Sequence, residues 1–345
     1  MKKTVMITGG TGYIGSWIVK GLLEQGYHIK LPVRNINKKE KYQFLLDIGH
    51  QTQGRLEVFE ANLLIKGSYD EAAQNCSAII HTASPFTFDF KNPTYELLEP
   101  AVLGTENVLQ AANASKSVQK VVLTSSVGAI IGDMRDMKRK ELPAFSEENW
   151  NTSSNIHHKP YEYSKTMAEK KAWEIAKQQN QWELAVINPF FVMGPPLSQH
   201  LQSESINYML RHLKGNYKKG VPELHLGYVD VRDVAQAHIY ALENKVSGRH
   251  IVCERTSTLL GFAQTVESQF PNQFELPKKI IPKWMMYLLG PTVGMKRKYI
   301  KTNIGHAIKI DNSKSIDALK MDYIPLEKTI RDMVQRLMDF KLIEQ

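Results

Sequence analysis

Tyr161 and Lys165 lie four residues apart in a segment whose apolar residues recur at helical spacing. On an α-helix this separation places both side chains on one face, with their Cβ atoms about 6 Å apart. A nearby ammonium stabilises a phenolate and lowers a tyrosine pKa from its usual value near 10. Such a tyrosine can exchange a proton with a carbonyl oxygen. The pair therefore predicts acid–base chemistry, although the same spacing also occurs on ordinary surface helices.

A third candidate group comes from Ser125 and Ser126, which follow the apolar run VVLT. Their place is the carboxyl end of a predicted parallel strand, where ligands of such sheets lie. A hydroxyl at this point can orient a substrate carbonyl. The alternative is that these small polar residues only cap the end of the strand.

Three glycines, Gly9, Gly12 and Gly15, separate the first predicted strand from the first predicted helix. Glycine permits the tight turn, the close approach of a pyrophosphate and the packing of helix on strand. Backbone amides at a helix N-terminus can then face an anion. The spacing predicts a dinucleotide-binding turn; the alternative is a turn that only connects the two elements.

Arg34 follows the second predicted strand, and Lys38 lies one helical turn further if a helix begins there. Enzymes that use NAD usually carry an acidic residue at this strand end, which binds the ribose 2′-hydroxyl. A guanidinium instead suits a 2′-phosphate, through planar bidentate contacts. We therefore expect NADP (NADPH) as the cofactor. The alternative is that Arg34, Lys38 and the neighbouring lysines form only a solvated basic face.

Short apolar runs alternate with amphipathic stretches through the first 190 residues, which predicts a parallel sheet covered on both faces by helices. The expected strands are 4–8, 28–33, 56–60, 78–81, 120–124 and 183–188, and the expected helices are 13–25, 97–112 and 161–178. The fold class is therefore α/β: a doubly wound parallel (Rossmann) sheet with a smaller, mostly helical substrate-binding cap.

Gly194, Pro195 and Pro196 mark the turn at which the chain is expected to leave the sheet. It is expected to return over 227–231 and 248–252, with a helix over 233–243 between them. Further helices are expected over 205–213, 284–289 and 326–342. We assign residues 1–190 plus 226–257 to the dinucleotide-binding domain, and residues 191–225 plus 258–345 to the cap.

The chain resembles the extended short-chain dehydrogenase/reductase family, near its dihydroflavonol reductase, cinnamoyl-CoA reductase and aldehyde (ketone) reductase branch. The resemblance extends to about residue 240 and rests on the motifs TGGTGYIG, PVRN, ANLL, HTASPF, VVLTSS, YEYSKTMAEK and YVDVRDVAQAH. It implies that Ser126, Tyr161 and Lys165 are catalytic, and that Lys165 also binds the nicotinamide ribose.

The resemblance further implies a set of cofactor-binding residues around the sheet. Those residues are Gly9, Thr11, Gly12, Tyr13, Ile14, Gly15, Arg34, Lys38, Asn62, Leu63, Thr82, Ala83, Ser84, Tyr161, Lys165, Pro189 and Val192. Within the set, Asn62 and Leu63 would flank the adenine, and backbone groups around Pro189 and Val192 would hold the carboxamide.

Apolar residues near the predicted site favour a small aldehyde or ketone as substrate. The substrate-binding candidates are Ser84, Phe86, Phe88, Ser126, Tyr161 and Phe190, with Pro85 and Met193 beside them. Several of these residues could instead be ordinary core.

The sequence departs from the family pattern at two places. Asn62 stands where this branch often has aspartate, but it keeps a polar side chain there. The segment HHKPYEY lacks the signature of cinnamoyl-CoA reductases, so a CoA thioester substrate is unsupported. His157 and His158 in this segment are interpreted as loop residues, because no carboxylate or cysteine cluster beside them indicates a metal site.

Composition excludes several other classes of protein. The chain has 345 residues, 42% hydrophobic and 23% charged, as in an ordinary folded protein. Its net charge of +9 is not accompanied by a nucleic-acid-binding motif. No run of 18 apolar residues predicts a membrane span, and the glycines end the first apolar run too early for a signal peptide. Cys76 and Cys253 show no metal spacing.

These observations predict a cytoplasmic NADPH-dependent carbonyl reductase that acts reversibly on a small molecule, as a monomer or homodimer, with no nucleic-acid, membrane or metal partner. Two alternatives stay open. A nucleotide-sugar epimerase or dehydratase would use the same three residues with retained NAD, and a non-catalytic dinucleotide sensor would bind cofactor without turnover. The sequence does not name the substrate, because the cap determines it.

Overall fold

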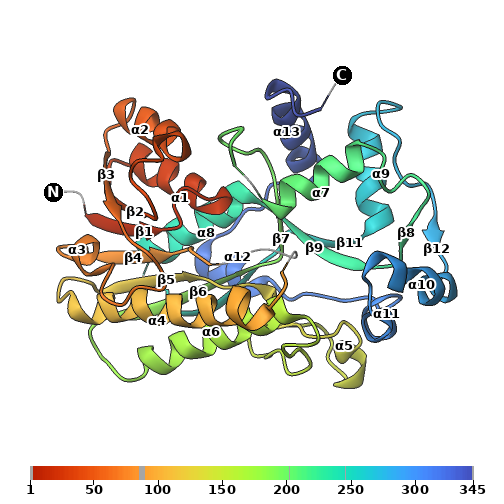
Figure 1. Ribbon diagram of the computed structural model, residues 1–345, viewed down its shortest axis with the longest axis horizontal. Coiled ribbons are helices and arrows are strands. Elements are labelled where there is room, and N and C mark those ends of the chain that lie inside the picture. Colours follow the sequence, from red (N-terminus) through yellow and green to blue (C-terminus); the bar gives the residue numbers. More distant parts are fainter. Residues whose placement is uncertain (1–2, 85–89, 202, 245, 344–345) are drawn as a thin grey trace.

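A seven-stranded, entirely parallel sheet forms the centre of the molecule, with strand order β10-β6-β5-β4-β1-β2-β3 (Figure 1). In the computed structural model, residues 3–84, 90–201, 203–244 and 246–343 are described. The strands are β1 Thr4–Thr8, β2 His28–Val33, β3 Arg55–Glu60, β4 Ala78–His81, β5 Lys120–Thr124, β6 Glu183–Pro189 and β10 Gly248–Val252. The predicted parallel sheet is confirmed, and the strand order reverses between β1 and β4, where such folds bind their ligands.

Helices cover both faces of this sheet, as Figure 1 shows. One face carries α1 Tyr13–Glu24, α2 Gln43–His50 and α8 Val231–Glu243, and the other carries α3 Asp70–Ala73, α4 Glu99–Ala114 and α6 Pro160–Ala176. Successive residues of β1 point to opposite faces of the sheet: Val5 and Ile7 pack toward α1, whereas Met6 packs toward α4. This alternation explains why the buried strands are continuous apolar runs.

The remaining elements lie mostly at the carboxyl ends of the strands. They comprise the helices α5 Asp136–Arg139, α7 Glu204–Leu213, α9 Leu259–Gln269, α10 Lys283–Leu289, α11 Arg297–Asn303, α12 Ser313–Leu319 and α13 Leu326–Asp339, and the short turns η1 Lys39–Lys41, η2 Thr94–Leu98, η3 Val127–Ala129 and η4 Gly290–Val293. They also include two small sheets, β7 Phe191–Met193 with β9 His225–Asp230 and β11 Arg255–Thr258, and β8 Val221–Pro222 with β12 Ile280–Ile281.

The expectation that the chain rejoins the main sheet over residues 227–231 is wrong. That segment is β9, which pairs in parallel with β7 and antiparallel with β11, outside the main sheet. Only β10 returns, beside β6. An apolar run records that a strand is buried but not which sheet it joins, because partner choice depends on residues far away in sequence. The proposed domain boundaries stay a prediction.

Within the described ranges, no helix is long and apolar enough to cross a lipid bilayer.

Candidate active site

The glycine turn connects β1 to α1 in the way that the sequence predicts. Gly9 has φ +69°, in the left-handed region, and its carbonyl accepts a hydrogen bond from the Gly12 amide at 2.9 Å. A Cβ at Gly9 would come within 2.7 Å of the Ala83 amide nitrogen, and one at Gly15 would meet the Gly9 carbonyl. These two glycines therefore allow β1, α1 and the end of β4 to approach one another.

Gly12 differs from its two neighbours in the turn, because a Cβ there would meet only the Gly9 carbonyl, at 3.1 Å. Gly12 also begins α1 without any side-chain cap, and the first turn of that helix carries no acidic residue. The space beside Gly12 is thus open and faced by helix N-terminal amides, which fits the pyrophosphate of a dinucleotide. Thr11 and Ile14 flank it and are half-buried.

Tyr13 lies in this turn, but its side chain faces the interior. The hydroxyl is buried and donates to the Gly194 carbonyl at 2.5 Å. The Tyr13 side chain therefore joins the glycine turn to the segment after β7, and only its backbone is free to face a phosphate.

The loop after β2 presents Arg34 and Lys38 to solvent, and both are exposed. No helix begins between them, so the condition for helical spacing is not met: the Asn35 side chain accepts from the Asn37 amide at 2.8 Å in a turn over residues 35–38, and α2 begins only at Gln43. Asn35 favours this turn because its side chain competes with helical hydrogen bonding. Glu60, at the end of the neighbouring strand, accepts from the Ile36 amide at 3.3 Å. A carboxylate therefore borders the loop, which the sequence did not reveal.

The residues expected to flank the adenine follow β3 and are half-buried. The Asn62 side-chain oxygen accepts from the Leu64 amide at 3.0 Å, and the Leu63 carbonyl accepts from the Asn107 side chain at 2.7 Å. Asn62 thus shapes its own turn, a role that an aspartate would also serve.

Thr82 and Ala83, after β4, lie directly beside the glycine turn. The Thr82 hydroxyl donates to the Thr8 carbonyl at 2.8 Å, and the Ala83 amide donates to the Thr8 hydroxyl at 3.3 Å. Ala83 and Ser84 also line a small cavity together with Lys165. The predicted phosphate turn and the predicted catalytic lysine therefore lie at one edge of the sheet.

Ser126, Tyr161 and Lys165 come together at the carboxyl end of β5. Ser126 begins η3, where its hydroxyl accepts from the Gly128 amide at 3.0 Å, and it also hydrogen-bonds the Tyr161 hydroxyl. The Lys165 ammonium lies 5.9 Å from the centroid of the Tyr161 ring. Ser126 thus caps its turn and contacts the tyrosine, so the two interpretations of the serine are compatible.

Ser125 points elsewhere, which separates the roles of the two serines. Its hydroxyl donates to Glu169 at 2.5 Å, in the interior behind the site. Ser126, by contrast, hydrogen-bonds Tyr161. Gly128 allows this geometry, because a Cβ there would press on Glu162 of α6 at 3.0 Å.

The expectation that Lys165 lowers the pKa of Tyr161 is wrong for the protein alone. Burial raises the pKa of Tyr161, the charge of Glu162 raises it further, and the hydrogen bond with Ser126 only partly opposes them. Burial likewise lowers the pKa of Lys165 to about 8, against the opposing charge of Glu169. Desolvation therefore sets the direction of both shifts, and the tyrosine is held protonated.

A buried polar network behind the triad was not predicted. Glu169, fully buried and one helical turn after Lys165, accepts hydrogen bonds from Arg249 at 2.5 Å and Asn188 at 2.8 Å as well as from Ser125. The Asn188 side chain also donates to the Ser126 carbonyl at 3.1 Å. The helical spacing from Lys165 to Glu169 was a usable signal, but nothing local indicated that the carboxylate is buried.

The substrate side is only partly described. Pro85, Phe86 and Phe88 lie outside the described residues. Met193 is fully buried core, the alternative that the sequence left open for it, whereas Phe190 is half-buried and packs against the apolar cluster around Ile130.

The residues expected to hold the carboxamide, Pro189 and Val192, lie on either side of Phe190 in sequence. Pro189 ends β6 next to Asn188, and through it next to Ser126, whereas Val192 is 7% exposed in β7, paired with Val229. Both positions lie at the carboxyl edge of the sheet, as the carboxamide assignment requires.

Comparisons with known proteins indicate the family of the chain. The sequence model of the NAD dependent epimerase/dehydratase family matches residues 5–253. A cinnamoyl-CoA reductase of Medicago truncatula is 35% identical over 341 residues, which cover 98% of this chain and 96% of that protein. A bifunctional dihydroflavonol 4-reductase/flavanone 4-reductase of Malus domestica is 32% identical over 283 residues, covering 80% and 79%.

A solved structure extends the likeness to the whole fold. The Gre2 protein of Candida albicans in complex with NADPH matches with a TM-score of 0.77 at 31% identity, covering 98% of this chain and 99% of that chain.

Proposed function

Because the chain belongs to the NAD dependent epimerase/dehydratase family, as an extended short-chain dehydrogenase/reductase, we propose that it reduces a carbonyl group with NADPH through Ser126, Tyr161 and Lys165. The enzyme is an oxidoreductase that acts on carbonyl and alcohol groups with NADP as cofactor. The observation that carries the proposal is the contact between the Ser126 and Tyr161 hydroxyls, with Lys165 under the same ring.

Different residues would serve cofactor binding and the chemical step. The glycine turn would hold the pyrophosphate, Arg34 the 2′-phosphate and Lys165 the nicotinamide ribose. When bound, the cofactor supplies the hydride. Ser126 orients the carbonyl oxygen, and Tyr161 donates its proton to that oxygen. The raised pKa of Tyr161 keeps this proton in place at neutral pH, which suits reduction.

The substrate class that fits best is a small aldehyde or ketone. The half-buried Phe190 packs against the apolar cluster that includes Val127, the residue after Ser126, and so offers apolar surface near the site. The opposite direction requires Tyr161 to accept a proton, so alcohol oxidation should gain rate as the pH rises.

Tyr161→Phe tests the proposal, because it keeps the ring and removes only the acidic proton. With NADPH and a panel of aldehydes and ketones, kcat should fall about 10²- to 10⁴-fold while NADPH binding stays nearly unchanged. Tyr163→Phe is the matched control: two residues along α6, Tyr163 points about 160° away from Tyr161.

An inactive Tyr163→Phe beside a nearly normal Tyr161→Phe would reverse the assignment. A wild-type protein that interconverts nucleotide sugars without consuming NADPH would instead indicate an epimerase. One that binds NADPH but turns over none of these substrates would indicate a sensor.

A further inference from the structure

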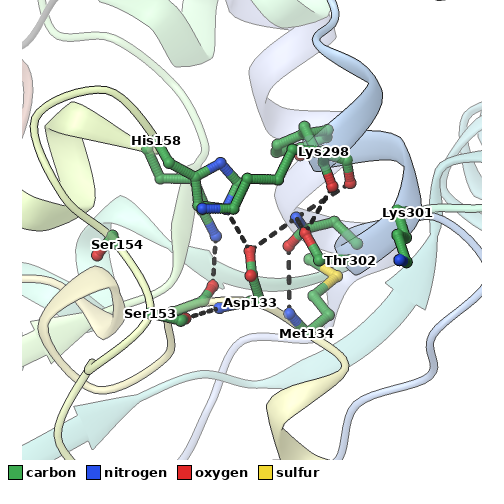
Figure 2. A network of polar contacts seen from close by, with 12 residues as sticks. Asp133, Met134, Ser153, Ser154, His158, Lys298, Lys301 and Thr302 are labelled. Atoms are coloured by element: carbon green, nitrogen blue, oxygen red, sulfur yellow. Dashed lines mark hydrogen bonds and ion pairs between the residues drawn. The ribbon is translucent and has the colours of Figure 1, made fainter.

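His158, three residues before the catalytic tyrosine, forms a buried pair with Asp133. Their side chains are each 5% exposed, and the His158 Nε2 atom lies 2.7 Å from the Asp133 carboxylate. Figure 2 shows the two side chains turned toward each other. The adjacent His157 is exposed. His158 was expected to be a plain loop residue, and its partner comes from a segment 25 residues earlier.

Asp133 also binds the cap. The Asn303 side chain, at the end of α11, donates to the same Asp133 oxygen at 3.1 Å, and the Thr302 side chain hydrogen-bonds this carboxylate as well. The backbone strengthens the connection, since the Met134 amide donates to the Asn303 side chain at 3.2 Å. In Figure 2, Thr302 lies across Asp133 from His158. One carboxylate therefore joins the loop before α6 to a helix of the cap.

The two segments that contain Asp133 and His158 each lead to a catalytic residue. The chain runs from Ser126 through η3 to Asp133, and from His158 through Lys159 to Tyr161. The segment 155–158 is closed by reciprocal backbone hydrogen bonds between Asn155 and His158, at 2.8 and 3.0 Å. The anchoring therefore acts on the first turn of the catalytic helix.

Lys159, the residue between this anchor and α6, has a strained backbone. Its φ of +58° lies in the left-handed region, which a side chain disfavours. Such conformations persist where the surroundings over-determine them. Here the Lys159 ammonium donates to the Gly132 carbonyl at 2.5 Å, and it lies 3.3 Å from Glu162. The start of the catalytic helix is thus held in a conformation that the sequence alone does not favour.

The charge of Asp133 is maintained by its partners. Burial opposes ionisation, but hydrogen bonds from His158, Thr302 and Asn303 outweigh it and hold the pKa of Asp133 below its ordinary value. Tyr299 of α11 is buried nearby, and burial together with the charges of Glu162 and Asp133 raises its pKa. An ionised Asp133 can accept several hydrogen bonds at once, as an anchor between three segments requires.

We propose that Asp133 is a positioning residue that, through His158 and Asn303, ties the first turn of the catalytic helix to the cap and so places the Tyr161 hydroxyl. This inference rests on the proposed reductase function. A displacement of about 1 Å at a reacting group can cost about 100-fold in rate. The cap then influences catalysis through this carboxylate as well as through contact with substrate.

The test compares His158→Phe, which removes the hydrogen bond, with His158→Gln, whose amide nitrogen can replace Nε2. His157→Gln is the matched control on the neighbouring exposed residue. At saturating NADPH, kcat should fall about 10- to 100-fold in His158→Phe, recover largely in His158→Gln, and stay at the wild-type value in His157→Gln. NADPH affinity should stay within about twofold in all three, because the glycine turn and Arg34 are remote from the pair.

A second readout separates positioning from simple loss of folded protein. With NADPH deuterated at the transferred position, the isotope effect on kcat should rise in His158→Phe and in Asn303→Ala, because a misplaced proton donor slows the chemical step. A smaller folded fraction lowers the measured rate but leaves the isotope effect unchanged. Asn303→Ala keeps the test valid if His158→Phe does not fold.

The two possible failures are distinct. A wild-type protein without turnover refutes the proposed function. An active wild type whose His158→Phe and Asn303→Ala variants match His157→Gln in kcat and isotope effect overturns the role of Asp133.

Discussion

Replacing Glu169 by glutamine tests the role of the buried network behind the triad. The contacts of Glu169 allow the loss of unfolding free energy to be estimated. The two carboxylate oxygens accept from Arg249 at 2.5 Å, Ser125 at 2.5 Å, Asn188 at 2.8 Å and Trp173 at 3.3 Å. Glutamine keeps one acceptor oxygen and places an amide NH₂ where the other stood. That group cannot accept, so at least one buried donor then faces another donor.

The larger loss comes from Arg249, which becomes a buried cation without its counterion. Breaking a buried ion pair in this way costs about 3–5 kcal/mol. Arg249 retains backbone carbonyl acceptors at Glu147, Asn149 and Ala129, and it stacks 4.0 Å from the Trp150 ring. We therefore expect the lower end, about 3 kcal/mol of unfolding free energy, and a melting temperature lower by about 5 °C.

The same substitution acts on Lys165. Burial lowers the pKa of Lys165 to about 8, and the Glu169 charge counteracts that shift. Without this charge the ammonium deprotonates at lower pH. Since the charged form is the one expected to bind the ribose, the basic limb of the kcat/KM profile should move to lower pH.

The assays are calorimetry and a pH–rate profile, with Glu174→Gln as the control on the same helix. The Glu174 side chain is 55% exposed and pairs with Lys171 at the surface, so its removal should change stability by no more than about 0.5 kcal/mol. The reasoning would be refuted if Glu169→Gln had the same melting temperature as Glu174→Gln and the basic limb of its kcat/KM profile stayed at the wild-type pH.

Three further predictions concern the cofactor site and the fold. Arg34→Ala should weaken NADPH binding about 10- to 100-fold and leave NADH binding unchanged in titrations, because one charge-assisted contact is lost; equal losses for both cofactors would contradict the 2′-phosphate assignment. Gly12→Ala should lower NADPH affinity at least about tenfold while the melting temperature barely changes. Gly9→Ala should also lower the melting temperature, because Gly9 has φ +69° and its Cβ would lie 2.7 Å from the Ala83 amide nitrogen. Equal losses of stability in the two variants would contradict the open space beside Gly12. Burial raises the pKa of Asp233 to about 7, so the folded state binds an extra proton between about pH 4 and 7 and loses stability as the pH rises through that range. Asp233→Asn should therefore stabilise the protein at pH 8 by about 1–3 kcal/mol and much less at pH 5, measured by denaturant unfolding; an equal effect at both pH values would rule out the ionisation.

Local structure followed closely from the sequence. The strands 4–8, 28–33, 78–81, 120–124 and 248–252 have the predicted bounds. A continuous apolar run between turn residues can be recognised from the few residues that form it. No helix begins between Arg34 and Lys38 for a local reason, the Asn35 side chain, which favours a turn. The strand expected over residues 227–231 exists as β9 His225–Asp230, but its sheet partners, β7 and β11, lie elsewhere in the chain.

Residue type and spacing by themselves determined the glycine turn, the choice of Tyr161 with Lys165, and the family to which the chain belongs, because these depend on short-range geometry. The resemblance already favoured Ser126 over Ser125, and the tertiary structure supplied the physical reason: adjacent residues at a strand end point in opposite directions, so Ser126 contacts Tyr161 whereas Ser125 contacts Glu169. Only the tertiary structure joined Asp133, His158 and Asn303, which are up to 170 residues apart. The direction of the Tyr161 pKa shift was likewise decided there, because desolvation depends on everything that packs around a group and no spacing along the chain encodes it.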